Sequence, residues 1–179
     1  GRNMHQDVQE ILFSLEEIQH RTRKLGEQIS RDYAGKTLIL VGLLKGSVPF
    51  MAELMRYLTV DVRIDFMNVS SYTGAQSGQV VIKKDMEQDI AGKDVLIVED
   101  IIDTGNTLYN IKKMLEERKC ASCKIVTLLD KVESRTIDIQ ADYVGFDIPN
   151  AFVVGFGLDF DEKYRQLPYI GILKKECYE

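Results

Sequence analysis

Residues that could do chemistry gather in one segment of the chain, Val95-Leu-Ile-Val-Glu-Asp-Ile-Ile-Asp-Thr-Gly-Asn-Thr107. Its apolar start is typical of a buried strand, and a helix is expected from Thr107, so Asp103–Thr107 forms the turn between them. Such a turn offers backbone N–H groups at a helix N-terminus, where the helix dipole favours an anion. Gly105 lets a ligand approach the backbone closely. Because ligands in open α/β sheets bind beyond the carboxyl ends of strands, the turn predicts a phosphate site.

Acidic residues lie beside this predicted phosphate site: Glu99, Asp100 and Asp103. Carboxylates repel a bare phosphate, so either a ribose whose hydroxyls donate to them or a bound Mg²⁺ must lie between. Alternation along a strand sends Glu99 and Asp100 to opposite sides, so both face one ligand only if the chain turns immediately after Asp100. A lone Asp-Thr-Gly is more often a helix cap in solvent, but the whole pattern favours a binding site.

The elements that must position this segment alternate between helices and strands. Ser14-Leu-Glu-Glu17 is a capping box that predicts a helix ending near Gly35, and Ser47-Val-Pro49 starts a second helix ending at about Leu58. A third helix is expected over 107–119, and a polar loop over 70–78. Strands are expected at 37–43, 60–66 (with Val60, Val62, Ile64 and Phe66 alternating), 79–83, 94–100, 124–129, 142–146, 151–155 and 169–173. This order predicts an α/β fold with a mainly parallel central sheet flanked by helices, and a small flap built by both ends of the chain.

Composition narrows the class of protein. A chain of 179 residues fits one domain, which we assign to residues 4–179, with Gly1–Asn3 as an expression-tag remnant. The net charge of −5 argues against a broad nucleic-acid surface. The apolar runs are too short to span a membrane and no signal peptide is evident, so we expect a cytoplasmic protein. Cys120 and Cys123 could form half a zinc site or a redox pair, but reduced thiols are favoured because no second pair exists.

The Val95–Thr107 segment matches a known signature: hydrophobic residues, Glu-Asp, two hydrophobics, Asp-Thr-Gly, any residue, Thr. On this segment the chain resembles the type I phosphoribosyltransferases, and from about residue 8 onwards it resembles hypoxanthine-guanine phosphoribosyltransferases. The resemblance implies the type I phosphoribosyltransferase fold, with a small hood over the active site. It also implies a magnesium-dependent purine salvage enzyme that forms a homo-oligomer, a dimer or a tetramer. Such an enzyme transfers the 5-phosphoribosyl group from phosphoribosyl pyrophosphate to hypoxanthine or guanine, giving IMP or GMP and pyrophosphate.

The resemblance further assigns roles to individual residues. The catalytic residue is Asp103, which accepts the N7 proton of the purine or stabilises it while N9 attacks. Phosphoribosyl pyrophosphate is expected to contact Leu44, Lys45, Gly46, Glu99, Asp100, Asp103, Thr104, Gly105, Asn106, Thr107 and Arg165. The purine is expected to contact Lys131, Phe152, Val153 and Asp159. Mg²⁺ is expected at Glu99 and Asp100, and a second Mg²⁺ at Asp159. Ser71 and Tyr72 match a flexible lid, and a cis peptide bond is implied before Lys45.

Two other functions are also compatible with the sequence. A regulator that keeps this fold to sense nucleotides would bind RNA or DNA, and should carry a basic face or an added domain. A sister enzyme would act on xanthine, adenine or a pyrimidine; Lys131 and the segment Phe152–Asp159 argue for 6-oxopurines. Phe156 and Phe160 stand where many relatives of the resembled family have tyrosine, which removes one hydroxyl contact at Phe160.

Overall fold

The computed structural model describes residues 4–71 and 80–179. Its elements, in chain order, are β1 (Val8–Phe13), α1 (Leu15–Asp32), β2 (Thr37–Leu43), α2 (Val48–Met55), β3 (Asp61–Ser71), β4 (Val80–Lys84), β5 (Asp94–Ile102), α3 (Asn106–Glu117), β6 (Ser122–Asp130), β7 (Tyr143–Asp147), β8 (Val153–Val154) and β9 (Ile170–Leu173). Short 3-10 turns lie at Val132–Ser134 and Lys175–Cys177.

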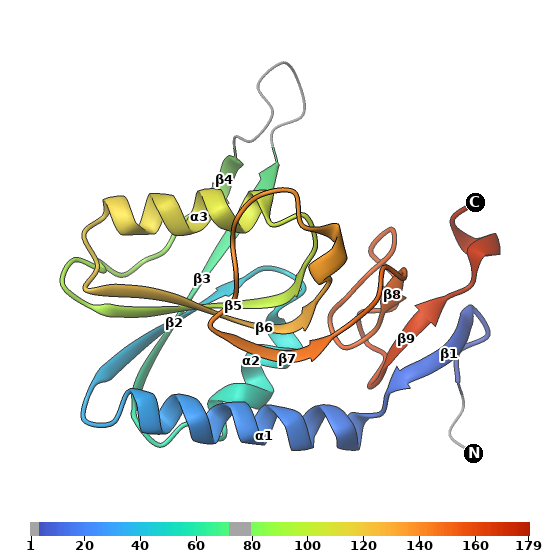
Figure 1. Cartoon of the computed structure of the whole chain (residues 1–179), viewed down its shortest axis with the longest axis horizontal. Helices are drawn as coiled ribbons and strands as arrows, with labels where there is room; N and C mark the ends of the chain where they lie inside the picture. Colours follow the sequence, from blue (N-terminus) through green and yellow to red (C-terminus); the bar gives the residue numbers. More distant parts are fainter. Residues whose placement is uncertain (1–3, 72–79) are drawn as a thin grey trace.

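The central sheet is mainly parallel, as the sequence predicted. Within the described residues it has six strands in the order β4-β3-β2-β5-β6-β7. β2 lies inside the sheet and pairs in parallel with β3 on one side and β5 on the other, so that Leu40 is opposite both Ile64 and Leu96. β4 pairs antiparallel with β3 at the edge. The carboxyl ends of β2, β5, β6 and β7 therefore meet at one edge of the sheet (Figure 1).

Helices cover both faces of this sheet, with α3 on one side and α1 and α2 on the other (Figure 1). Alternation along β2 supplies both cores: Leu38 and Leu40 pack with α1 and α2, whereas Ile39 and Val41 pack with α3. All four side chains are almost completely buried, and each such burial contributes roughly 1.5–3 kcal/mol. The near-continuous apolar run in this strand thus follows from coverage on both faces.

Helix α1 starts at the predicted capping box. The Ser14 hydroxyl accepts a hydrogen bond from the Glu17 N–H, and the Glu17 carboxylate accepts one from the Ser14 N–H, each at 3.1 Å. Ile18, Leu25 and Ile29 form the buried face of the helix. Among the described helices, none has the length and apolar character that a membrane span requires.

Both ends of the chain build a small hood, as predicted. In the described part of the chain it is a three-stranded antiparallel sheet in the order β1-β9-β8, in which Val8 pairs with Leu173. Val8, Val154 and Leu173 form its core together with Tyr164 and Tyr169. The hood lies beyond the carboxyl ends of the central strands (Figure 1), so the space between sheet edge and hood is where the predicted site must lie.

Several strands differ in length from the sequence prediction, two of them by more than the others: those expected at 60–66 and 151–155. The strand expected at 60–66 runs from Asp61 to Ser71, so the predicted loop loses its first residues to β3. The strand expected at 151–155 shortens to Val153–Val154. Gly155 and Gly157, each with a φ of 99°, end the extended backbone there, because positive φ is incompatible with a strand.

Candidate active site

The turn after β2 packs tightly against the next strand. The Leu44–Lys45 peptide bond is cis, as the family resemblance implied. Gly46 is buried, and a Cβ atom at this position would lie 2.8 Å from Cγ of Asp100, with Oδ2 of the same carboxylate closer still. On the other side, the Gly46 carbonyl lies against Gly157 of the loop 155–169 between β8 and β9, which we call the hood loop. Glycine is therefore required at position 46 by close approach, and the turn touches both the sheet and the hood.

The predicted phosphate site has the expected form. Gly105 adopts a φ of 88° and is the N-cap of α3, which begins at Asn106. The Asn106 N–H donates a long hydrogen bond of 3.3 Å to the Thr104 hydroxyl. One N–H group at the start of α3 is therefore already hydrogen-bonded within the turn. A pocket of about 240 Å³ opens here, lined by Glu99, Ile101, Ile102, Asp103, Thr104, Gly105, Thr107 and Leu108. The helix N-terminus thus borders a cavity on one side, whereas Ile139 and Arg135 pack against Gly105, where a Cβ atom would lie 2.5 and 2.8 Å from their side chains.

Asp103 and Lys131 come together from two neighbouring strand ends. Lys131 follows β6, and its N–H donates to the Ile102 carbonyl at 3.0 Å, which ties the two loops. Its Nζ atom lies 3.9 Å from Oδ2 of Asp103. The Lys131 side chain is only 11% exposed, whereas Asp103 is 58% exposed. A lysine after a strand is usually a solvated charge; this one is instead largely withdrawn from water and is directed at a carboxylate.

Glu99 and Asp100 have different neighbours. β5 continues to Ile102, so the turn that would aim both carboxylates at one ligand does not follow Asp100. Glu99 lines the pocket at the start of α3, whereas Asp100 lies over Gly46 and accepts a hydrogen bond from the Ile101 N–H at 2.8 Å. Burial, reinforced by the neighbouring Asp100 carboxylate, raises the pKa of Glu99 well above its ordinary value.

This donor set suits Mg²⁺. Magnesium commonly takes one or two protein carboxylates and completes its shell with water and substrate phosphates. A cation would stabilise the charged form of Glu99, whose pKa is raised first by burial and then by the neighbouring Asp100 carboxylate. Across residues 4–71 and 80–179, no cluster of three or more His, Cys, Asp or Glu side chains is assembled to hold a metal. Oxygen atoms of a substrate would therefore have to share in the binding.

The hood supplies an aromatic surface. Phe152 precedes β8 and stacks on Tyr178, with ring centroids 4.7 Å apart and an interplanar angle of 23°. Phe160 meets the Phe152 ring edge-on at 5.4 Å. Val153 is buried and pairs with Ile172 of β9. Phe152 is thus held by rings from two other parts of the hood, of which Tyr178 was not singled out from the sequence.

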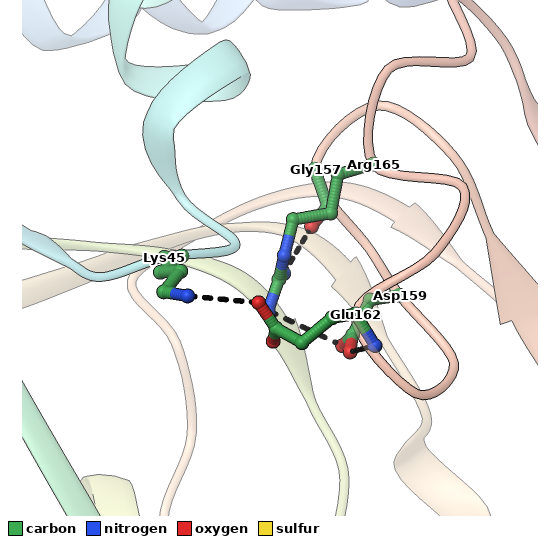
Figure 2. A network of polar contacts seen from close by, with 5 residues as sticks. All are labelled: Lys45, Gly157, Asp159, Glu162 and Arg165. Atoms are coloured by element: carbon green, nitrogen blue, oxygen red, sulfur yellow. Dashed lines mark hydrogen bonds and ion pairs between the residues drawn. The ribbon is translucent and has the colours of Figure 1, made fainter.

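Opposite charges converge where the hood loop meets the turn after β2 (Figure 2). The Glu162 carboxylate accepts hydrogen bonds from Lys45 Nζ and Arg165 Nη2, both at 2.8 Å. Arg165 Nη1 donates to the Gly157 carbonyl at 2.6 Å, and Nη2 lies 3.5 Å from Asp159. The hydrogen bond from Lys45, and then that from Arg165, lower the pKa of Glu162 to about 2.

Most of the predicted site residues thus lie along one edge of the sheet or on the hood facing it. Of the predicted lid residues, Tyr72 lies outside the described residues, and Ser71 is described only as the last residue of β3. Sequence reasoning missed Glu162, which stands in an acidic run that reads as solvated surface. It also missed Ser47, whose buried Oγ has no hydrogen-bond partner among the described residues. Its position as the N-cap of α2, directly after the turn that carries Lys45, is the feature that could have drawn attention to it.

A parallel sheet with a helix N-terminus, a carboxylate and a buried lysine at its carboxyl edge defines an α/β protein built to bind a phosphorylated small molecule. The sequence profile of the phosphoribosyl transferase domain matches residues 9–161 of the chain. The chain belongs to this family. The family and the fold class predicted from the sequence are therefore confirmed.

Individual relatives are similar over nearly the whole chain. Hypoxanthine-guanine phosphoribosyltransferase of Streptococcus pneumoniae is 56% identical over 177 residues, covering 98% of each sequence. The protein of the same name from Streptococcus thermophilus is 54% identical over the same length and coverage. The crystal structure of a hypoxanthine phosphoribosyltransferase from Staphylococcus aureus matches with a TM-score of 0.96 at 51% identity, covering 100% of both chains.

Proposed function

We propose that this protein transfers the 5-phosphoribosyl group from phosphoribosyl pyrophosphate to hypoxanthine or guanine, giving IMP or GMP and pyrophosphate. The observation that carries the proposal is the pairing of Lys131 with Asp103 beside the α3 N-terminus. O6 and N7 are neighbouring atoms on one edge of a 6-oxopurine. An ammonium and a carboxylate 3.9 Å apart suit these two atoms, because the first donates to O6 and the second accepts from N7.

The 5-phosphate fits the start of α3. The N–H groups of that first turn and the hydroxyl of Thr104 are the donors, and Thr104, Gly105 and Thr107 line the pocket that would take the phosphate. This anchors the sugar with its anomeric carbon towards Asp103. Two cations, Lys45 from the turn after β2 and Arg165 from the hood, meet at Glu162 and provide the charge that a departing pyrophosphate needs.

The base is held by Lys131 and by the Phe152 ring, which supplies an apolar surface for stacking. Asp103 then accepts the N7 proton as N9 attacks the anomeric carbon, and positive charge develops on the sugar. Mg²⁺ supplies neutralisation of the pyrophosphate when bound. Glu99 and Asp100 would hold one ion, and Asp159 from the hood would help to hold a second. The proposal includes one domain spanning residues 4–179, a homo-oligomeric enzyme and a cytoplasmic location.

A base-comparison assay tests this function. Purified enzyme with Mg²⁺ and phosphoribosyl pyrophosphate is given hypoxanthine, guanine, xanthine, adenine or a pyrimidine in separate reactions, and pyrophosphate release and the nucleotide formed are both measured. Hypoxanthine and guanine should give the highest kcat/KM. A higher value with adenine or a pyrimidine would overturn the 6-oxopurine assignment, and a higher value with xanthine would overturn the preference for hypoxanthine and guanine. No pyrophosphate release with any base would overturn the activity.

A further inference from the structure

The Glu162 carboxylate bridges two cations that the proposed function assigns to pyrophosphate. Its Oε2 atom lies 2.8 Å from Lys45 Nζ, and its Oε1 atom lies 2.8 Å from Arg165 Nη2 (Figure 2). A phosphate group would bind between Lys45 and Arg165 in the same way, with one oxygen directed at each cation. The chain thus places an anion of its own where an anionic ligand is expected.

The backbone around Glu162 aims the side chain at this position. Asp161 and Glu162 have φ values of 54° and 66°, a conformation that non-glycine residues adopt at some cost in energy. Reciprocal backbone hydrogen bonds between Phe160 and Lys163 close the turn, at 3.2 and 3.0 Å. The Glu162 N–H donates to Asp159 at 2.9 Å. The turn is therefore held in place by its own hydrogen bonds, independently of the two ion pairs that the carboxylate makes.

The partners of Glu162 differ in how firmly they are held. The Arg165 side chain is 26% exposed and is fixed to the Gly157 carbonyl. Glu162 and Lys45 are 61% and 62% exposed, so both side chains can move into solvent. Ion pairs at this exposure are weak, because water competes for both charges. An incoming pyrophosphate, which carries more charge than one carboxylate, can therefore displace Glu162 and keep the cations.

We propose that Glu162 is an intramolecular competitor of pyrophosphate, which occupies the Lys45–Arg165 position in the free enzyme and leaves when the substrate binds. The inference rests on the proposed function, since that function identifies the ligand as a pyrophosphate. The competitor weakens the binding of phosphoribosyl pyrophosphate, and it also returns to the two cations as product pyrophosphate leaves. Glu162 thereby lowers the affinity for both ligands and favours product release.

Titration calorimetry with inorganic pyrophosphate and Mg²⁺ tests the inference without turnover. Glu162→Gln should bind pyrophosphate about three- to tenfold more tightly than wild type, as expected from the loss of two exposed ion pairs. Glu27→Gln, which removes the same charge from the exposed surface of α1, should bind as wild type does. Glu162→Asp keeps the charge but is one methylene shorter, so it cannot bridge both cations and should also bind more tightly.

The outcomes separate this inference from the proposed function. Wild-type binding with no gain in Glu162→Gln overturns the inference and leaves the function standing. A gain in Glu162→Gln but none in Glu162→Asp also overturns it, because the effect would then come from charge alone rather than from occupation of the position. Weaker binding of pyrophosphate to Glu162→Gln would also overturn the inference, because Glu162 would then position Arg165 for the ligand instead of competing with it. Failure of the wild-type enzyme to bind pyrophosphate would remove the ligand assignment on which both rest.

Discussion

Substitution of Gly46 by alanine probes the contact between the turn after β2 and the carboxylate of Asp100. The added Cβ would lie 2.8 Å from Asp100 Cγ and closer to Oδ2, far inside van der Waals contact. The Asp100 side chain is short, and its other oxygen is held by the Ile101 N–H at 2.8 Å. Either Asp100 rotates away and loses this bond, or the turn carrying Lys45 shifts. Both changes disturb residues assigned to phosphoribosyl pyrophosphate.

The expected magnitude follows from this clash. Adding a methyl group to a well-packed position costs about 1–3 kcal/mol, and a cost of that size on ligand binding lowers affinity roughly 5- to 150-fold. Initial rates of Gly46→Ala, measured at saturating hypoxanthine with varied phosphoribosyl pyrophosphate, should therefore show a higher KM for phosphoribosyl pyrophosphate than wild type. The KM for hypoxanthine should stay near that of wild type, because Lys131 and Phe152 do not contact Gly46 in the packing described above.

Two controls isolate the cause. Gly92→Ala also introduces a methyl group, at a φ of 74° but with no atom within 4 Å, so it should lower Tm through backbone strain and leave the KM values unchanged. In an Asp100→Ala background, Gly46→Ala should add little, because the carboxylate that it displaces is gone. If Gly46→Ala keeps wild-type kinetics, or costs the same factor with and without Asp100, the reasoning is refuted.

Further predictions concern the base. Asp103→Asn should lower kcat with hypoxanthine by about 10²- to 10⁴-fold while leaving the KM for phosphoribosyl pyrophosphate nearly intact; an unchanged kcat would exclude Asp103 as the base. Lys131→Ala should raise KM for hypoxanthine and guanine and narrow the gap in kcat/KM to adenine. Replacement of Lys124, an exposed lysine on β6, by alanine should change neither. Tyr178→Ala should raise KM for hypoxanthine, because Phe152 loses its stacked neighbour, and Tyr178→Phe should not; a lower KM would mean that Tyr178 occupies the base position.

The sequence alone predicted those features whose cause is local. The capping box of α1, the buried runs of β2 and β5 and the turn at Gly105 each depend on residues a few positions apart, and each lies where predicted. The resemblance extended this to Lys131, whose low exposure no local pattern indicates. Membership in the family follows from the Val95–Thr107 signature, since it combines a strand, an acidic pair and a helix start in one continuous segment.

Features that depend on distant partners were not predictable in this way. Alternation along β3 predicted a buried face containing Ile64, yet Ile64 is 43% exposed and Asp65 is 5% exposed. Asp65 is buried because it accepts hydrogen bonds from the backbone N–H groups of Glu87 and Gln88, each at 2.9 Å. β1 was missed for the same reason: its residues Val8–Phe13 do not alternate between apolar and polar, and its pairing with the distant β9 makes the segment a strand.

The pairing of β1 with β9 has a consequence for how the enzyme is made. Val8 leaves the ribosome early, but its partner Leu173 emerges after almost all of the chain. At about 5–20 residues per second, β1 waits roughly ten to thirty seconds for β9. During synthesis the central sheet can fold first, because β2 to β7 need no later segment to complete their pairing. The hood closes last, so nascent chains should gain affinity for ligands only after β9 has emerged, and a ribosome stalled before β9 should carry a folded sheet without a working site.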